Sequence, residues 1–143
     1  TGILHSEKSD AGHDVHFVQM WVVPDTEKIA PGYDQLDVGP ALESGELLVV
    51  ASGMPRHRHD SAISVRQENA ALYAARLAHG VGTVSPVAPL AHLFVARGSV
   101  ELEGAGVLGT GDAARITGAD GQRVTAGPDG AEVLMWEMHA TLG

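Results

Sequence analysis

Turn signals built from glycine, proline and aspartate recur through the C-terminal half of this sequence, roughly 8 to 12 residues apart. They leave room only for short segments, and the segment 99–103 alternates polar and apolar residues as a half-buried strand does. This spacing is typical of β-sandwiches and β-barrels, so we predict an all-β protein. The expected strands are 91–96, 99–103, 113–116, 122–126 and 131–138, with the first two forming a hairpin around Arg97–Gly98.

Three further segments bear on the organisation of the chain. Residues 15–23 are apolar on both faces and predict a fully buried strand. Residues 24–40 shift to proline, glycine and charge, which indicates a connector and a domain boundary near residue 38. The segment 69–77 is ambiguous, because its alanines and leucines favour a helix in a chain otherwise patterned for strands. Propensity alone leaves helix and strand open.

Composition excludes several classes of function. The chain has no cysteine, so a metal site would need histidine or carboxylate ligands. With 18 acidic against 9 basic residues, the net charge of −9 disfavours binding to nucleic acid. No apolar run approaches the roughly 20 residues that span a bilayer, and no signal peptide is visible at the start. We therefore expect a cytoplasmic protein that does not bind a membrane.

His5 and Glu7 are the first candidate ligands. On a strand, residues two apart project from the same face, so both side chains could reach one metal ion. A solvated strand end is the more common interpretation of such a short pattern, and the pair alone does not decide between them.

The other histidines are assigned structural or solvent-exposed positions. His57 and His59 form a second His-x-His pattern, but they lie among charged residues after a Gly-Met-Pro turn, which is typical of an exposed loop without fixed ligand geometry. Solvent exposure is expected for His13, His79 and His139. Structural positions within strands are expected for His16 and His92.

Several segments together resemble the pirin family, whose members are two-cupin proteins of the cupin superfamily. The resemblance runs in order along nearly the whole chain, through residues 1–7 (TGILHSE), 16–24 (HFVQMWVVP), 31–35 (PGYDQ), 71–77 (ALYAARL), 95–100 (VARGSV) and 111–114 (GDAA). It implies a cupin jelly-roll barrel or sandwich. It also implies that residues 1–38 are a remnant of an N-terminal cupin with its connector, that residues 39–143 are the C-terminal cupin, and that 71–77 is a strand.

The resemblance also implies a metal site. The resemblance implies that the N-terminal cupin of the longer protein contains an iron site of three histidines and one glutamate. His5 and Glu7 match the third and fourth of these ligands. The first two ligands belong to an upstream His-x-His motif that has no counterpart before Thr1. His57 and His59 do not replace it, because they follow the connector. We therefore expect Fe(II) or another divalent metal in a longer parent protein, and at most weak binding by this chain.

Two functions follow from the resemblance. The first is a non-haem dioxygenase acting on flavonol-like, quercetin-type substrates, with Glu7 as ligand and proton acceptor; this chain by itself is then expected to be inactive. The alternative is a redox- or metal-sensitive regulator that binds a transcription protein or a metabolic enzyme. The partner is accordingly a small aromatic substrate or a protein. Unpaired N-terminal strands, including Phe17 and Trp21, are expected to pack on the C-terminal cupin or on a second copy in a homodimer.

Overall fold

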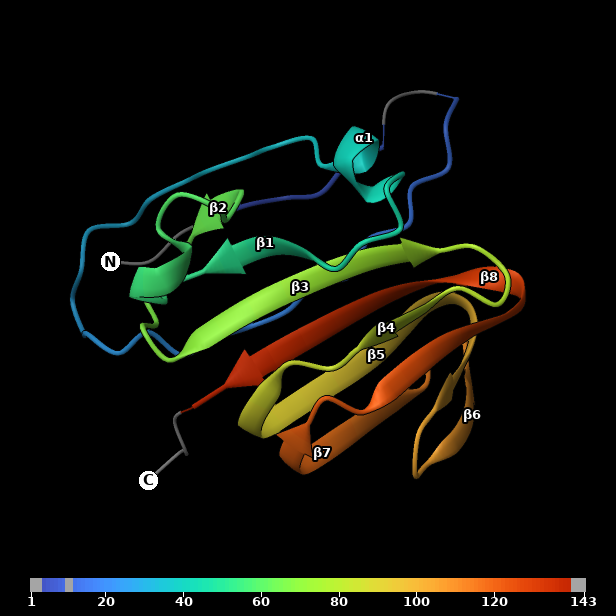
Figure 1. The fold of residues 1–143 in the computed structure, drawn as a ribbon. Coiled ribbons are helices and arrows are strands. Elements are labelled where there is room, and N and C mark those ends of the chain that lie inside the picture. The colour runs from blue at the N-terminus through green and yellow to red at the C-terminus, as the bar shows by residue number, and fades with distance from the viewer. Residues whose placement is uncertain (1–3, 10–11, 140–143) are drawn as a thin grey trace.

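The computed structural model describes residues 4–9 and 12–139, so the Thr1–Ile3 part of the first motif lies outside it. Within the described residues, regular structure begins with the short helix α1 (Gly39–Leu42), and a 3-10 turn, η1 (Pro55–His57), follows the first strand. The strands are β1 (Leu48–Ser52), β2 (Ile63–Ser64), β3 (Ala70–Leu77), β4 (Gly82–Val84), β5 (Val87–Leu102), β6 (Gly106–Gly109), β7 (Ala113–Asp120) and β8 (Arg123–Met138). The predicted all-β class is confirmed (Figure 1).

Two long strands, β5 and β8, organise the sheet. The hydrogen-bonded order is β2-β1-β3-β8-β5-β6, with β4 paired to β8 and β7 paired to β5. The register between β5 and β8 shifts between Val95 and Arg97 and again between Gly98 and Val100. Such bulges bend a strand, so each long strand contributes to both layers of a jelly-roll sandwich. Figure 1 shows β5 and β8 folding over in this way beside β3.

The core lies between these layers and is formed by alternate residues of the long strands. Its members share near-complete burial and come from β3, β5 and β8: Ala75, Leu77, Leu93, Val95, Val100, Leu102, Val124, Ala126, Ala131, Val133 and Met135. Because successive side chains of a strand point to opposite faces, the neighbours of these residues face outward. Leu72, His92 and Trp136 lie on that outer face, paired across β3, β5 and β8.

The strand predictions were partly correct. Residues 70–77 form β3, which settles the ambiguous segment in favour of a strand. The predicted hairpin at Arg97–Gly98 is wrong, because both halves belong to the single strand β5 and each pairs with β8. Gly98 has a φ of 74° and lies so close to Gly130 that an added Cβ would be 2.0 Å from that residue's carbonyl oxygen. A left-handed glycine here produces a bulge and not a turn.

The buried strand predicted for residues 15–23 is also wrong. This segment contains no strand, and four of its side chains are largely exposed: Val15, Phe17, Trp21 and Val23. The intervening Val18, Met20 and Val22 are half-buried. Exposed and half-buried residues therefore alternate as in a strand, but the segment forms no strand. Phe17 and Trp21 are thus 56% and 85% exposed in this chain, although the prediction was that their side chains would be covered. Packing on a second copy stays a prediction, as does the division at residue 38.

The segment ahead of α1 is nevertheless attached to the β-sandwich through Val23 and Asp25. The Asp25 amide donates to the Arg66 carbonyl at 3.0 Å, and the Gln67 side chain donates to the Val23 carbonyl at 2.9 Å. The Glu68 amide donates to the Asp25 carboxylate at 2.7 Å. These bonds fix where the extended chain enters the fold. No helix in the described part of the chain is long and apolar enough to cross a membrane.

Candidate functional site

His5 and Glu7 lie together, although the described residues around them form no strand. The His5 Nε2 atom is 3.2 Å from Glu7 Oε1, and about half of each side chain is exposed. The amide nitrogen of Gln19 is 3.4 Å from the same His5 nitrogen. An open concavity of about 400 Å³ surrounds the three groups, and it is lined by His5, Glu7, Phe17, Val18, Gln19, Met20 and Trp21.

The donor set of this concavity fits part of a divalent metal site. An imidazole nitrogen and a carboxylate oxygen lie 3.2 Å apart, and both are ligands that iron, nickel and zinc accept. A protein-bound metal of this type usually takes at least three protein ligands. Among residues 4–9 and 12–139, no group of three or more His, Asp or Glu side chains could hold a metal ion. The assignment of His5 and Glu7 as ligands therefore stays a prediction that requires further donors.

A second polar cluster, centred on Glu137, lies within the β-sandwich and was not predicted from the sequence. Glu137 is 2% exposed, and its side chain follows Val133 and Met135 on the core-facing side of β8. Its carboxylate accepts hydrogen bonds from Arg56 and, at 2.6 Å, from the Tyr73 hydroxyl. His139 Nε2 is also 2.6 Å from Glu137 Oε1. A buried carboxylate at this position is fully hydrogen-bonded, as burial of a charge requires.

His57 belongs to the edge of this Glu137 cluster. Its Nδ1 lies 3.0 Å from the Ser52 hydroxyl, and its ring meets that of Tyr73 edge-on, with 5.8 Å between the centroids. Arg56 donates to His57 Nε2 at 3.1 Å. The predicted exposed loop is therefore wrong for His57, which η1 holds half-buried against β3, and correct for the exposed His59.

The contacts of the Glu137 cluster shift the pKa values of Glu137, Tyr73 and His57. Burial would raise the pKa of Glu137, but the hydrogen bonds from Arg56, Tyr73 and His139 outweigh it, and the pKa lies below its usual value. Burial and the hydrogen bond to Glu137 raise the pKa of Tyr73 to about 12. Burial and the nearby Arg56 charge lower the pKa of His57. At neutral pH the cluster thus holds one carboxylate, one guanidinium and a neutral imidazole at His57.

One signal in the sequence could have revealed this cluster. The core-facing positions of β8 are apolar at Val133 and Met135, and the alternation then places a glutamate at the next core-facing position. A charged residue on the apolar face of a strand needs partners, and Arg56 is separated from it by 81 positions in the sequence. The identity of those partners depends on tertiary structure.

The remaining histidines occupy varied positions. His13 and His79 are exposed, as predicted. His92 lies in β5, and burial and the Arg115 charge lower its pKa, which agrees with a structural role. His16 is exposed and outside any strand, contrary to prediction, and accepts a hydrogen bond from Arg97 at 3.3 Å. His139 is exposed but bound to Glu137, so it is not simply solvated.

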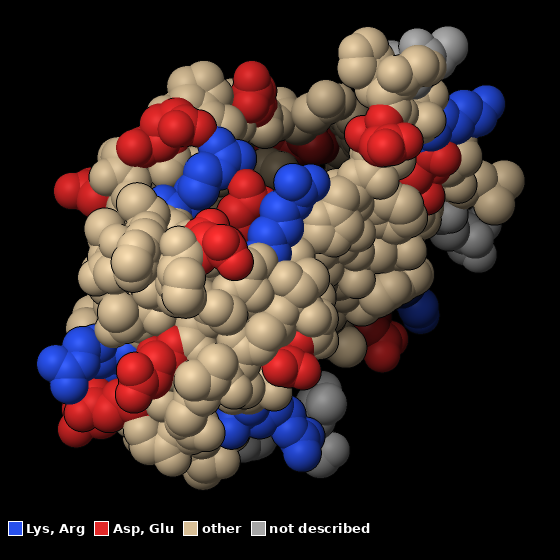
Figure 2. All heavy atoms as spheres, turned by 90° about the vertical axis from the view of Figure 1, so that its right-hand side faces the viewer, with Lys and Arg blue, Asp and Glu red and all other residues tan. Residues whose placement is uncertain are grey.

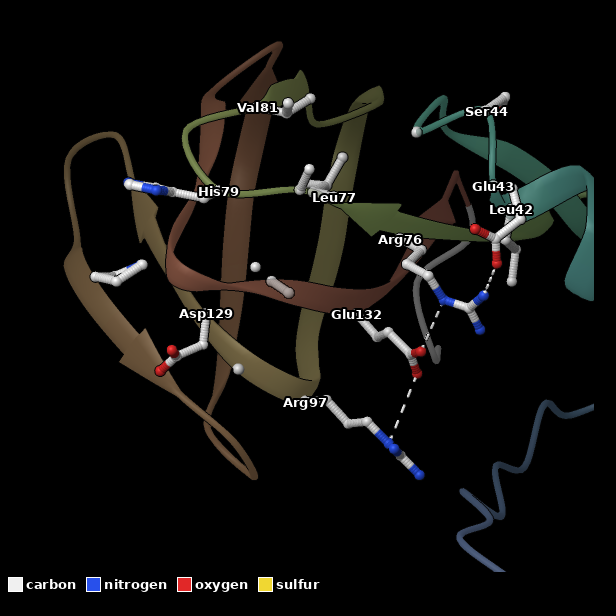
Figure 3. Close-up of a pocket in the computed structure, with 16 residues that line it drawn as sticks. Leu42, Glu43, Ser44, Arg76, Leu77, His79, Val81, Arg97, Asp129 and Glu132 are labelled. Carbon is white, nitrogen blue, oxygen red and sulfur yellow. Dashed lines mark hydrogen bonds and ion pairs between the residues drawn. The ribbon is translucent and has the colours of Figure 1, made fainter.

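A row of ion pairs crosses the far end of the fold, where an open concavity of about 640 Å³ lies between α1, β3, β5 and β8. Arg76 pairs with Glu43 and donates to Glu132 at 2.9 Å, while Arg97 lies 3.9 Å from the other Glu132 oxygen (Figure 3). Figure 2 shows acidic and basic side chains side by side on this face. Arg76 and Arg97 thus both have Glu132 as a counter-charge in this concavity.

Comparison with known proteins identifies the family of the chain. Residues 49–138 match the family described as the quercetinase C-terminal cupin domain. The chain belongs to the pirin family. Over its entire length it is 47% identical to proteins of Mycobacterium bovis and Mycobacterium tuberculosis that carry the name "Putative quercetin 2,3-dioxygenase". It covers 58% of their length, so this pirin-family chain spans little more than half of the curated relatives it matches.

Solved structures show the same fold. The bacterial pirin YhhW of Escherichia coli, in complex with nickel(II), has a TM-score of 0.64 at 22% identity, covering 82% of this chain and 48% of that protein. The Escherichia coli protein YhaK has a TM-score of 0.57 at 21% identity, covering 67% of this chain and 42% of that protein. These likenesses confirm the predicted cupin architecture of the pirin-family chain.

Proposed function

We propose that this chain belongs to a whole protein that is a divalent-metal-dependent dioxygenase acting on flavonols of the quercetin type. The observation that carries the proposal is the convergence of His5 Nε2 and Glu7 Oε1, 3.2 Å apart, in a concavity open to solvent. The names of the mycobacterial relatives and the nickel complex of the Escherichia coli pirin support it.

The concavity suits a planar aromatic substrate. Trp21 is 85% exposed and Phe17 is 56% exposed, and both line the concavity that contains His5 and Glu7. Exposed aromatic rings bury large area against a flat ligand and favour stacked or edge-on contact with it. Their exposure, which the sequence did not predict, leaves them available to a flavonol.

His5 and Glu7 would hold the metal together with donors from outside the described residues, for which the family resemblance implies two histidines. A divalent metal, when bound, supplies positive charge that favours the deprotonated form of a flavonol hydroxyl. Glu7 is placed to accept that proton, because its carboxylate lies at the rim of the concavity and is about half exposed. The Gln19 amide nitrogen lies 3.4 Å from the His5 Nε2 nitrogen, so a metal bound there would take the place of this contact.

The test uses the whole protein, with any residues that its gene encodes ahead of Thr1, loaded with Fe(II) or Ni(II). We expect stoichiometric metal and O2 uptake that depends on quercetin. His5→Ala should release the metal, and Glu7→Gln should abolish O2 uptake. His79→Gln, at an exposed histidine away from the concavity, is the matched control and should behave as the wild type.

Two results would overturn the proposal. Metal-loaded whole protein that consumes no O2 with any flavonol would exclude the dioxygenase and favour the regulator. The 143-residue chain by itself should bind the metal weakly, since among its described residues the concavity brings together two strong donors, His5 and Glu7. Tight stoichiometric metal in this chain would refute the shared site.

A further inference from the structure

The proposed function leaves the His-x-His pattern of residues 57–59 unused, and the structure gives its two histidines different surroundings. His59 is exposed, whereas His57 is half-buried and has a polar neighbour at each ring nitrogen. The Ser52 hydroxyl lies 3.0 Å from Nδ1, and Arg56 Nε donates to Nε2 at 3.1 Å. Because Ser52 is only 4% exposed, His57 connects the turn η1 to the buried end of β1.

These two contacts fix the tautomer of His57. A guanidinium can only donate, so Nε2 is the acceptor for Arg56 and carries no proton. The neutral ring therefore holds its proton on Nδ1 and donates it to the Ser52 hydroxyl. Ser52 can accept this bond, since its own proton is directed at the Ala70 carbonyl, 3.4 Å away.

The turn that carries His57 reaches the strands through two side chains. In the described part of the chain, the backbone hydrogen bonds of residues 55–61 stay within residues 54–61. Arg56 bonds Glu137 on β8, and His57 lies against Ser52 on β1. The position of the turn therefore depends on whether the His57 ring can stay beside Arg56 and Ser52.

A second proton on His57 would turn Nε2 from an acceptor into a donor. Two N–H groups and two positive charges, those of His57 and Arg56, would then face each other across 3.1 Å. Arg56 cannot relieve the conflict by losing a proton, because a guanidinium stays charged. The closed arrangement thus suits the neutral ring alone.

The other titratable groups around this contact lie on the same turn, on β3 and at the end of β8: Asp60, Tyr73, Glu137 and His139. Tyr73 gives its proton to Glu137, and the Glu137 carboxylate already binds Arg56, so neither is free to neutralise a charged His57. Burial and the Arg56 charge outweigh the attraction of Glu137 and Asp60, and the pKa of His57 lies below its usual value.

We infer that residues 55–61 form an acid-sensitive latch: when His57 takes up a second proton, its ring leaves Arg56 and Ser52, and the turn detaches from the end of the sandwich. The inference does not rest on the proposed function. It assigns the His-x-His pattern a regulatory role in which His57 responds to pH and His59 does not.

The tautomer is the first test, made on the metal-free whole protein above the titration of His57. The 15N chemical shifts of the imidazole should show a protonated Nδ1 and an unprotonated Nε2. The opposite tautomer would mean that Arg56 does not donate to Nε2, and it would overturn the latch.

Hydrogen exchange measures the opening itself. Four amides donate hydrogen bonds inside the turn, those of His57, Arg58, Asp60 and Ser61. Their protection, corrected for the intrinsic effect of pH on exchange, should fall roughly two- to tenfold as the His57 ring titrates, the range expected for one net hydrogen bond. The Asp25 amide, which is bonded outside the turn, should keep its protection. Unchanged protection of the four amides through the titration would refute the inference.

Histidine variants assign the opening to one ring. His57→Gln keeps a polar side chain that does not titrate, so protection of the turn should no longer depend on pH. His59→Gln is the matched control two positions along the same loop and should keep the dependence. His139→Gln, which removes the other histidine in contact with Glu137, should keep it as well.

A dependence that survives His57→Gln, or that disappears in His139→Gln, would assign the opening to another group and overturn the latch. Should His57→Gln fail to fold, the tautomer and the exchange of the wild-type turn decide the question by themselves.

Discussion

Tyr73 of β3 and Glu137 of β8 are diagonal neighbours in the antiparallel ladder, and the Tyr73 hydroxyl donates to the Glu137 carboxylate at 2.6 Å. The pairing register places Ala71 opposite Glu137 and Met135 opposite Tyr73, so the bond crosses one step of the ladder. It is a charge-assisted bond in a largely dry environment, which makes it stronger than an ordinary neutral pair.

Loss of this bond should cost measurable stability. We expect Tyr73→Phe to lower the free energy of unfolding by about 1–2 kcal/mol, and Glu137→Gln by about 2 kcal/mol because Arg56 then lacks its counter-charge. Arg56 is half exposed, so water relieves part of the second penalty. Urea denaturation of the variants and the double variant measures both values. The double variant should lose less than the sum, and strict additivity would show that the bond contributes nothing.

The pH dependence of stability should show two steps. His57 and His92 have a pKa below 6.5 in the folded state, so below pH 6.5 the unfolded chain binds more protons and stability falls as the pH decreases. The pKa of Glu137 lies below 4.5, so a further loss begins as the pH falls below 4.5 and continues through the folded-state pKa. Urea midpoints across this range test the order of the steps.

Histidine variants assign the first step. His92→Gln should flatten the loss between pH 6.5 and its lower folded-state pKa, since a neutral amide does not titrate. His79→Gln, at an exposed position, should leave the curve as in the wild type. A first step that survives unchanged in His92→Gln and in His57→Gln would contradict the assignment.

Local patterns predicted the strands but not how strands continue through bends. Gly98 and Pro128–Gly130 carry ordinary turn signals, yet β5 and β8 run through them, because pairing between these two long strands outweighs local turn preference. The apolar segment 15–23 predicted a buried strand, but an apolar run becomes a strand only where a neighbouring edge accepts its hydrogen bonds. In the described part of the chain, this segment instead makes side-chain contacts, such as the hydrogen bond from the Trp136 indole to the Met20 sulfur.

The candidate metal site was also predicted only in part. His5 and Glu7 were identified by spacing and resemblance, and they do lie together. The contribution of Gln19 was not predicted, because it joins them from 14 positions away in the sequence. Glu137 was missed for the same reason: its partner Arg56 is distant in sequence, and no local pattern encodes that contact.

The ion-pair row at the far end should contribute little to stability. Glu132 pairs with Arg76 and lies near Arg97, but all three side chains are more than a third exposed. We expect Glu132→Gln to shift the urea midpoint less than Glu137→Gln does, and the difference from the wild type to vanish at about 1 M NaCl, where the Debye length is about 3 Å. A large shift that persists in salt would indicate that the row is structural.

Gly98 should be the least replaceable glycine of the bulge. Its φ of 74° disfavours any side chain, and an alanine Cβ would also lie 2.0 Å from the Gly130 carbonyl oxygen. Gly104 is the matched control, because its φ is 82° and an added Cβ would meet nothing within 4 Å. Gly104→Ala should therefore cost only the left-handed penalty of about 1–2 kcal/mol.

Gly98→Ala should cost clearly more than Gly104→Ala, since β5 must move away from β8 at the point where both strands bend into the second layer. The two variants are compared by urea denaturation. Equal losses would mean that the bulge relaxes without cost, and that the close approach of Gly98 to Gly130 does not hold the two layers in register.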